Sequence, residues 1–123
     1  MQSLINKVHY FKIPVSDVKQ AADWYSTVLG FRQQFVDEEE GVARLEIEEG
    51  PFIILVKADS GSRCNIIVNN EPQQIVTFTS QRIDDLYAVM VSHQVKVTDK
   101  ESDEWSRFFK FYDADGNMFL VHS

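Results

Sequence analysis

The chain has 123 residues, of which 44% are hydrophobic and 25% charged, as in an ordinary globular protein. Its formal net charge is −7 and no cluster of lysines and arginines is present, which excludes a nucleic-acid-binding protein of the basic kind. No apolar run is long enough to cross a bilayer, the first residues do not resemble a signal peptide, and the single cysteine excludes an intrachain disulfide. We therefore expect a cytoplasmic protein with no membrane or nucleic-acid partner.

The first half of the chain predicts a strand, a helix and three further strands. Apolar and polar side chains alternate over residues 7–15, which is the pattern of a strand. Ser16 or Asp17 then caps a helix whose apolar residues recur at helical spacing up to Leu29, and Gly30 ends it. The three strands are expected at residues 31–36, 43–48 and 52–57. The last of these is continuously apolar, so both of its faces are expected to be covered.

The second half predicts the same order of elements. A polar connector at 58–72 contains the apolar triplet 66–68, for which a short edge segment and an ordered lid both remain open. A strand is expected at 74–79, a helix at 83–91, and strands at 95–98, 105–112 and 118–122. A repeat of about 60 residues indicates a duplicated unit. We predict one α+β domain in which two βαβββ modules, 5–57 and 73–123, form a curved mixed sheet with a concave cleft.

Three short motifs resemble those of the vicinal oxygen chelate superfamily, which includes glyoxalase I, bleomycin-resistance proteins and extradiol dioxygenases. They are Val-Ser-Asp-Val at 15–18, Trp-Tyr-Ser-Thr-Val-Leu-Gly-Phe at 24–31, and Asp-Ala-Asp-Gly-Asn at 113–117. With the order of the elements, the resemblance covers nearly the whole chain. The motifs themselves have structural explanations: Asp17 caps a helix, Gly30 ends it, and Gly116 supplies a turn residue with positive φ.

In metal-dependent members of that superfamily, His, Glu or Gln side chains from the first and last strands of each module hold a divalent ion. Aligned through the motifs, these positions are Tyr10, Ile54, Ile75 and Leu120. Three hydrocarbons and a phenol cannot replace the water around a divalent cation. A register shifted by one residue would offer His9 but would leave both isoleucines in place, and His122 alone does not make a site. We therefore predict no metal and no other cofactor.

Alternation along the strands predicts which side chains point away from the helices and line the cleft. The predicted ligand-binding residues are Tyr10, Lys12, Arg44, Glu46, Ile54, Ile75, Thr77, Leu120 and His122. On the strand 105–112, either Phe109 and Phe111 or the alternate set with Lys110 faces the helix, and we favour the two phenylalanines. No catalytic residue is assigned, and Cys64 is interpreted as an inert loop thiol.

Two functions are compatible with these features. The favoured one is a metal-independent protein that binds and sequesters a small organic molecule, as the resemblance to bleomycin-resistance proteins implies. The acidic balance favours a cationic ligand, and the resemblance implies a homodimer. The alternative is a metal-dependent enzyme of the glyoxalase or lyase type that acts on vicinal oxygens. Catalysis is the less favoured of the two because the four ligand positions carry no metal-binding side chain.

Overall fold

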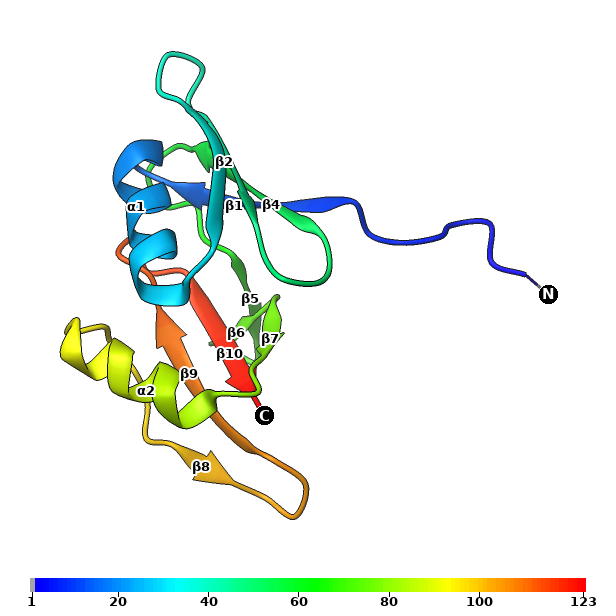
Figure 1. Cartoon of the computed structure of the whole chain (residues 1–123), viewed down its shortest axis with the longest axis vertical. Coiled ribbons are helices and arrows are strands. Elements are labelled where there is room, and N and C mark those ends of the chain that lie inside the picture. Colours follow the sequence, from blue (N-terminus) through cyan, green and yellow to red (C-terminus); the bar gives the residue numbers. More distant parts are fainter. Residues whose placement is uncertain (1) are drawn as a thin grey trace. The chain divides into compact units, whose positions relative to one another are not determined.

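A computed structural model describes residues 2–123 of the chain, which divide into two compact units (Figure 1). Unit 1 is Met1–Ser60 and unit 2 is Gly61–Ser123. Each unit builds its own four-stranded mixed sheet and carries one helix. The described helices are all too short and too polar to cross a membrane.

Unit 1 has the element order βαβββ. Its elements are β1 (Tyr10–Val15), α1 (Val18–Leu29), β2 (Arg32–Asp37), β3 (Val42–Glu46) and β4 (Phe52–Lys57). The strands lie in the order β1-β4-β3-β2, so that the first strand pairs with the last in parallel and the other pairs are antiparallel. A parallel pair needs a crossover between its strands. Here the segment from α1 to β3 provides it.

The helix α1 covers one face of this sheet because its apolar stripe matches the inward side chains of the strands. Tyr25 and Ala22 are fully buried, as are Ile13, Leu45 and Ile53 on the strands. The Asp17 carboxylate accepts a hydrogen bond from the Gln20 N–H at 3.0 Å, which confirms the predicted N-cap. Gly30 ends the helix at φ 77°, as predicted for a C-terminal glycine.

Unit 2 repeats this order and adds a hairpin in front of it. Its elements are β5 (Asn65–Val68), β6 (Glu71–Gln74), β7 (Thr77–Thr79), α2 (Ile83–Ser92), β8 (Glu101–Ser102), β9 (Arg107–Tyr112) and β10 (Met118–His122). The order β7-β10-β9-β8 and the parallel β7–β10 pair reproduce the topology of unit 1. The α+β class and the duplicated βαβββ module are therefore confirmed, while the joint curved sheet and its cleft stay predictions.

The core of unit 2 is aromatic. Phe109 and Phe111 are almost fully buried, and Phe109 meets the Tyr87 ring of α2 edge to face at 4.9 Å between centroids. Phe119 lies opposite Phe111 in the register of β10 and β9, with their rings 5.4 Å apart. The preference for Phe109 and Phe111 as the helix-facing pair is confirmed. His93 stands at the C-cap of α2.

Three segments differ from the sequence prediction. The segment 58–72 holds most of a two-stranded hairpin, β5–β6, in which the apolar triplet 66–68 pairs with residues 71–73. Ile75 lies between β6 and β7 instead of inside a strand that begins at Gln74. Residues 95–98 form only one isolated bridge, from Val97 to Phe111. A continuous strand is not formed here because a hydroxyl replaces part of the backbone pairing, as described below.

The turn 113–117 is a buried hydrogen-bonded clamp. The Asp113 carboxylate accepts hydrogen bonds from the N–H groups of Asp115 and Asn117, and from the Asn117 amide nitrogen at 2.7 Å. The amide oxygen of Asn117, which is fully buried, accepts a bond from the Cys64 N–H at 2.7 Å. Gly116 takes φ 83°, as predicted. This turn therefore ties the end of β9 and the start of β10 to the segment that leads into β5.

Asn117→Ala should lower the free energy of unfolding by roughly 2–4 kcal/mol, because it removes the acceptor of the buried Cys64 N–H and one hydrogen bond to the Asp113 carboxylate. Urea unfolding followed by fluorescence measures the change. Asn6→Ala, at an exposed site outside the helices and strands, is the matched control and should be neutral. A neutral Asn117→Ala would show that the clamp contributes little.

Candidate functional site

Each sheet has one face covered by its helix and one face without a helix, which we call the open face. On the open face of unit 1, Lys12 of β1 is paired with Ile54 of β4, and Ile54 with Arg44 of β3. Tyr10 and Glu46 belong to the same face because they lie two residues from Lys12 and Arg44 along their strands. All five residues predicted for unit 1 thus share one face, and their role in binding stays a prediction.

The carboxylate of Glu46 is already engaged by neighbours on β2. Arg32 Nη2 donates to Glu46 Oε1 at 2.6 Å, and the Gln34 amide donates to the other carboxylate oxygen. The hydrogen bond from Arg32 is the main cause that holds the pKa of Glu46 below its ordinary value. The hydrogen bond from Gln34 and the positive charges of Arg32 and Arg44 act in the same direction, and desolvation opposes them. Glu46 is therefore ionised and paired, which does not suit a general base.

The guanidinium of Arg44 is stacked on the ring of Phe52. Its central carbon lies 3.7 Å from the ring centroid, which is a close cation–π contact. The Nε atom of Arg44 is buried without a hydrogen-bond partner. Phe52 precedes Ile54 by two residues and lies on the same face of β4. The open face of unit 1 therefore combines an aromatic ring, an aliphatic side chain and an oriented cation.

The open face of unit 2 contains three of the four residues predicted there. Leu120 is paired with Thr77 of β7, and His122 with Thr79. Both ring nitrogens of His122 are engaged, Nε2 at 3.3 Å from the Thr79 hydroxyl and Nδ1 at 2.9 Å from the Ser123 carbonyl. Ile75 is 59% exposed and lies outside the strands, so alternation along a strand does not fix its direction.

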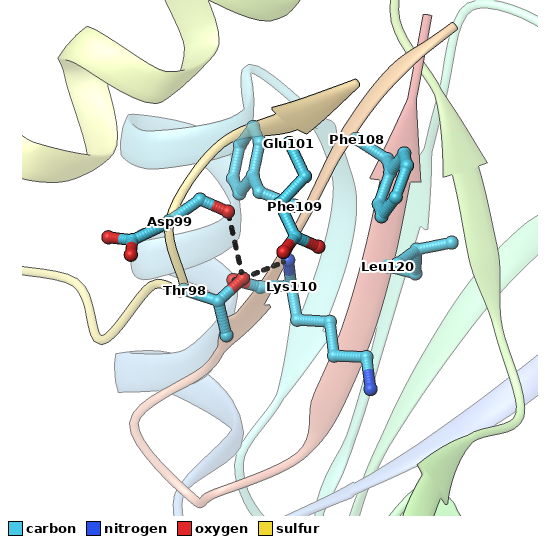
Figure 2. A pocket seen from close by; sticks show the side chains of 7 residues that line it. All are labelled: Thr98, Asp99, Glu101, Phe108, Phe109, Lys110 and Leu120. Atoms are coloured by element: carbon cyan, nitrogen blue, oxygen red, sulfur yellow. Dashed lines mark hydrogen bonds between the residues drawn. The ribbon is translucent and has the colours of Figure 1, made fainter. Parts of the chain in front are cut away.

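A pocket of about 310 Å³ opens beside this face of unit 2 (Figure 2). Its lining consists of Thr98, Asp99, Glu101, Phe108, Phe109, Lys110 and Leu120. Figure 2 shows the Glu101 carboxylate between the Thr98 hydroxyl and the Phe108 ring, whereas the Asp99 carboxylate points away from Phe108 and Leu120. The pocket therefore has an aromatic and aliphatic wall with one carboxylate directed along it.

The edge at 95–98, which contributes Thr98 to the pocket lining, is irregular. The Thr98 N–H donates to the Lys110 carbonyl at 2.9 Å, but the Lys110 N–H donates to the Thr98 hydroxyl, also at 2.9 Å, instead of to a backbone carbonyl. The acceptor of the second hydrogen bond is thus a side-chain hydroxyl, where a regular β-ladder would have a backbone carbonyl. The chain then continues into the short strand β8, where Glu101 is paired with Phe108.

The sequence prediction did not consider three of the residues that line this pocket, Thr98, Asp99 and Glu101, while Phe108 and Lys110 belong to the alternate set of the strand 105–112 that was expected to face away from the helix. Periodicity over 95–98 indicates a regular strand, and it gives no sign that a threonine hydroxyl interrupts the ladder. A threonine followed by the polar run Asp99 to Glu101 was the available signal for an irregular edge. Leu120 is the one pocket residue that was predicted to bind a ligand.

The residues at the four superfamily metal positions do not fit a divalent ion. Ile54, Ile75 and Leu120 have no donor atom, and the phenol of Tyr10 is a poor ligand unless ionised. Within residues 2–123, no three side chains of His, Cys, Asp or Glu gather closely enough to hold a metal. His9 lies edge to face with the rings of Tyr10 and Phe52, as an aromatic neighbour. No step of a reaction can therefore be assigned to a metal here.

Cys64 is not a plausible nucleophile. Its side chain is buried, and burial, with a smaller effect from the charge of Asp113, raises the pKa of its thiol above the ordinary value. A thiol with a raised pKa holds little reactive thiolate near neutral pH. The interpretation of Cys64 as an inert thiol is consistent with this placement.

The sequence model of the glyoxalase/bleomycin resistance protein/dioxygenase superfamily matches residues 7–121, nearly the whole chain. The chain belongs to this superfamily. The match confirms the resemblance drawn from the three motifs. No curated protein sequence matches the chain significantly. Membership identifies the fold but not the chemistry, which depends on the residues of the two open faces and the pocket.

Solved structures agree with this assignment. A superfamily member from Sphaerobacter thermophilus DSM 20745 superposes with a TM-score of 0.76 at 24% identity, covering 98% of each chain. TnmS3, an antibiotic-binding protein from Streptomyces sp. CB03234, gives 0.74 at 21% identity, covering 98% of this chain and 97% of its own. A glyoxalase/bleomycin resistance protein from the same organism gives 0.73 at 19% identity, covering 95% and 100%. At these identities the likeness shows the fold.

Arg32→Gln should raise the pKa of Glu46 toward its ordinary value, because the main hydrogen bond to the carboxylate is lost. A lowered folded-state pKa means that Glu46 stabilises the fold above its unfolded pKa and loses this effect as the pH falls through the folded pKa. Carbon-detected NMR titration of the Glu46 carboxyl measures the shift. Lys19→Gln, on the exposed side of α1, removes the same charge and should leave Glu46 unchanged. An unmoved Glu46 pKa in Arg32→Gln would contradict this assignment.

Proposed function

We propose that this protein binds a small organic molecule without a metal ion and is not an enzyme. The observation that carries the proposal is the replacement of metal-binding side chains by Tyr10, Ile54, Ile75 and Leu120 in a superfamily scaffold. Leu120 is also part of the apolar wall of the unit 2 pocket. Apolar walls with a few directed polar groups are typical of sites for organic ligands. The similarity of fold to an antibiotic-binding protein supports the same class of function.

The unit 2 pocket favours a cationic aromatic ligand. Phe108 offers an aromatic surface, Leu120 an aliphatic one, and Glu101 a carboxylate for which no hydrogen bond or ion pair is found in the described part of the chain. The only cation in the lining is Lys110, whose amino group extends away from Thr98 in Figure 2. A carboxylate beside an aromatic ring attracts a cation through both charge and the ring quadrupole. The net charge of −7 acts in the same direction at long range.

The metal-dependent alternative is not favoured by any observation on the two faces. Its reaction needs a Lewis acid held by several oxygen or nitrogen ligands, and the residues at those positions supply none. Glu46, the one carboxylate predicted for the cleft, is paired with Arg32. Homodimerisation and a cytoplasmic location, which the sequence predicted, stay predictions, and light scattering of the purified protein tests the first.

Removal of divalent metals should leave both stability and ligand affinity unchanged. The protein would be dialysed against a chelator and compared with the untreated sample by thermal unfolding and elemental analysis. Ligand affinity would be measured by titration calorimetry with 2-naphthylmethylammonium, a cationic aromatic compound. Because no metal contributes to the fold in this proposal, the unfolding midpoint should stay the same within error. Stoichiometric nickel, zinc, manganese or iron that survives dialysis would overturn the metal-free proposal.

Glu101→Gln should weaken the binding of 2-naphthylmethylammonium to the unit 2 pocket by roughly fivefold to tenfold, because a charge-assisted contact becomes neutral. Its affinity is measured by calorimetry, and NMR shifts at Phe108 and Leu120 locate the site. Glu104→Gln removes the same charge from the loop before β9, outside the pocket lining, and should change the affinity little. Equal affinities for the two variants, or no binding of any aromatic compound, would contradict the proposed pocket.

A further inference from the structure

The open face of unit 1 differs in charge from the unit 2 pocket. Arg44 is held in place by its stack on Phe52, yet no carboxylate lies within ion-pair distance of its guanidinium in the described part of the chain. Its buried Nε atom also has no hydrogen-bond partner. Because the flat side of the guanidinium stacks on the ring, the terminal N–H groups at its edge remain available to a ligand. Arg44 is thus an oriented cation without an ion-pair partner in the described part of the chain.

The acidic groups of this face form no ion pair with Arg44, although the charge of Arg44 is one of the smaller causes of the lowered pKa of Glu46. Glu46 is occupied by Arg32 and Gln34, and on β2 the Asp37 carboxylate accepts the Glu40 N–H at 3.0 Å. The remaining carboxylates of unit 1 lie in its turns, in the loop after β4 and on α1, and none of these segments is a strand of the open face. The guanidinium of Arg44 therefore has no ion-pair partner on this face, and Glu46 offsets its charge only at longer range.

A second unpaired cation lies two strands away. Lys12 is exposed and forms no ion pair with any residue that the structure describes, and Ile54 stands between Lys12 and Arg44 in the register. Adjacent strands are about 4.8 Å apart, so the two backbones are about 10 Å apart. Long side chains from both strands can lean over the isoleucine. The row Lys12–Ile54–Arg44 thus offers an apolar floor between two cations.

The equivalent row in unit 2 is Thr77–Leu120–Lys110, since both are defined by the same pairs of strands. Arg44 corresponds to Lys110, Ile54 to Leu120 and Lys12 to Thr77. In unit 2 the cation has the carboxylate of Glu101 in the same pocket lining, whereas Arg44 has only the ring of Phe52. Duplication has therefore kept the aliphatic centre of the row and changed the charge around it.

We propose that the open face of unit 1 binds the carboxylate group of a planar aromatic acid. Arg44 takes the carboxylate through its guanidinium fork, Lys12 adds a second positive charge, and the ring of the acid lies on Ile54 and Phe52. The planar fork matches a carboxylate with two parallel hydrogen bonds. This site goes beyond the proposed function, in which the ligand is a cation bound in the unit 2 pocket.

Three naphthalene compounds of equal size test this assignment on the full chain: 2-naphthoate, 2-naphthamide and 2-naphthylmethylammonium. NMR of the Arg44 Nε–H group and of the amides of β3 and β4 reports binding at this face. The carboxylate should bind there roughly tenfold more tightly than the amide, because its hydrogen bonds are charge-assisted. Raising the salt concentration should reduce this preference, since Lys12 is exposed and Arg44 is only half-buried.

Arg44→Gln should abolish the preference for the carboxylate over the amide, while Lys19→Gln, which removes one cation from α1, should keep it. Arg44→Lys keeps the charge without the fork and should retain only part of the preference; it decides the question if Arg44→Gln fails to fold. The proposal is overturned if naphthoate does not bind at this face at millimolar concentration, if the ammonium compound binds there as tightly, or if Arg44→Lys keeps the full preference. None of these results depends on Glu101, so a failure here leaves the unit 2 pocket intact.

Discussion

Alternation of side chains along a strand is the constraint on which the rest of this structure depends. A strand presents successive residues to opposite faces, and each module has only one helix with which to cover its sheet. In unit 1 the helix takes Ile13, Leu45 and Ile53, and in unit 2 it takes Phe109 and its neighbours. The residues next to these buried ones in each strand therefore point to the open face. The residues available for binding follow from the burial of their neighbours.

The duplicated modules show how far this constraint extends and where it stops. In both units the parallel pairing of first and last strands places an aliphatic residue, Ile54 or Leu120, at the centre of the open face. The pairing of strands does not determine which charged residues lie beside that aliphatic residue. Arg44 stacks on an aromatic ring of its own sheet, whereas Lys110 belongs to a pocket that also contains Glu101. The scaffold repeats, and the binding chemistry has diverged between its two copies.

Sequence reasoning succeeds here wherever local physics decides the outcome. Asp17 and Gly30 limit α1 as predicted, and the choice of Phe109 as a helix-facing residue is confirmed. It fails where one side chain competes with the backbone for a hydrogen bond. The Thr98 hydroxyl accepts the Lys110 N–H, the predicted strand is reduced to a single bridge, and the pocket forms beside it. Periodicity cannot register such a competition, because a threonine fits the alternating pattern equally well.

Total charge is a poor guide to the charge that a ligand meets. The chain carries a net charge of −7, from which the sequence favours a cation. The carboxylate of Glu46, however, is bound to Arg32 and Gln34. Arg44 has no ion-pair partner in the described part of the chain. At physiological ionic strength the screening length is about 8 Å, so distant carboxylates contribute little at Arg44. The charge of each open face is therefore set by which groups remain unpaired on it, which only the three-dimensional pairing of side chains reveals.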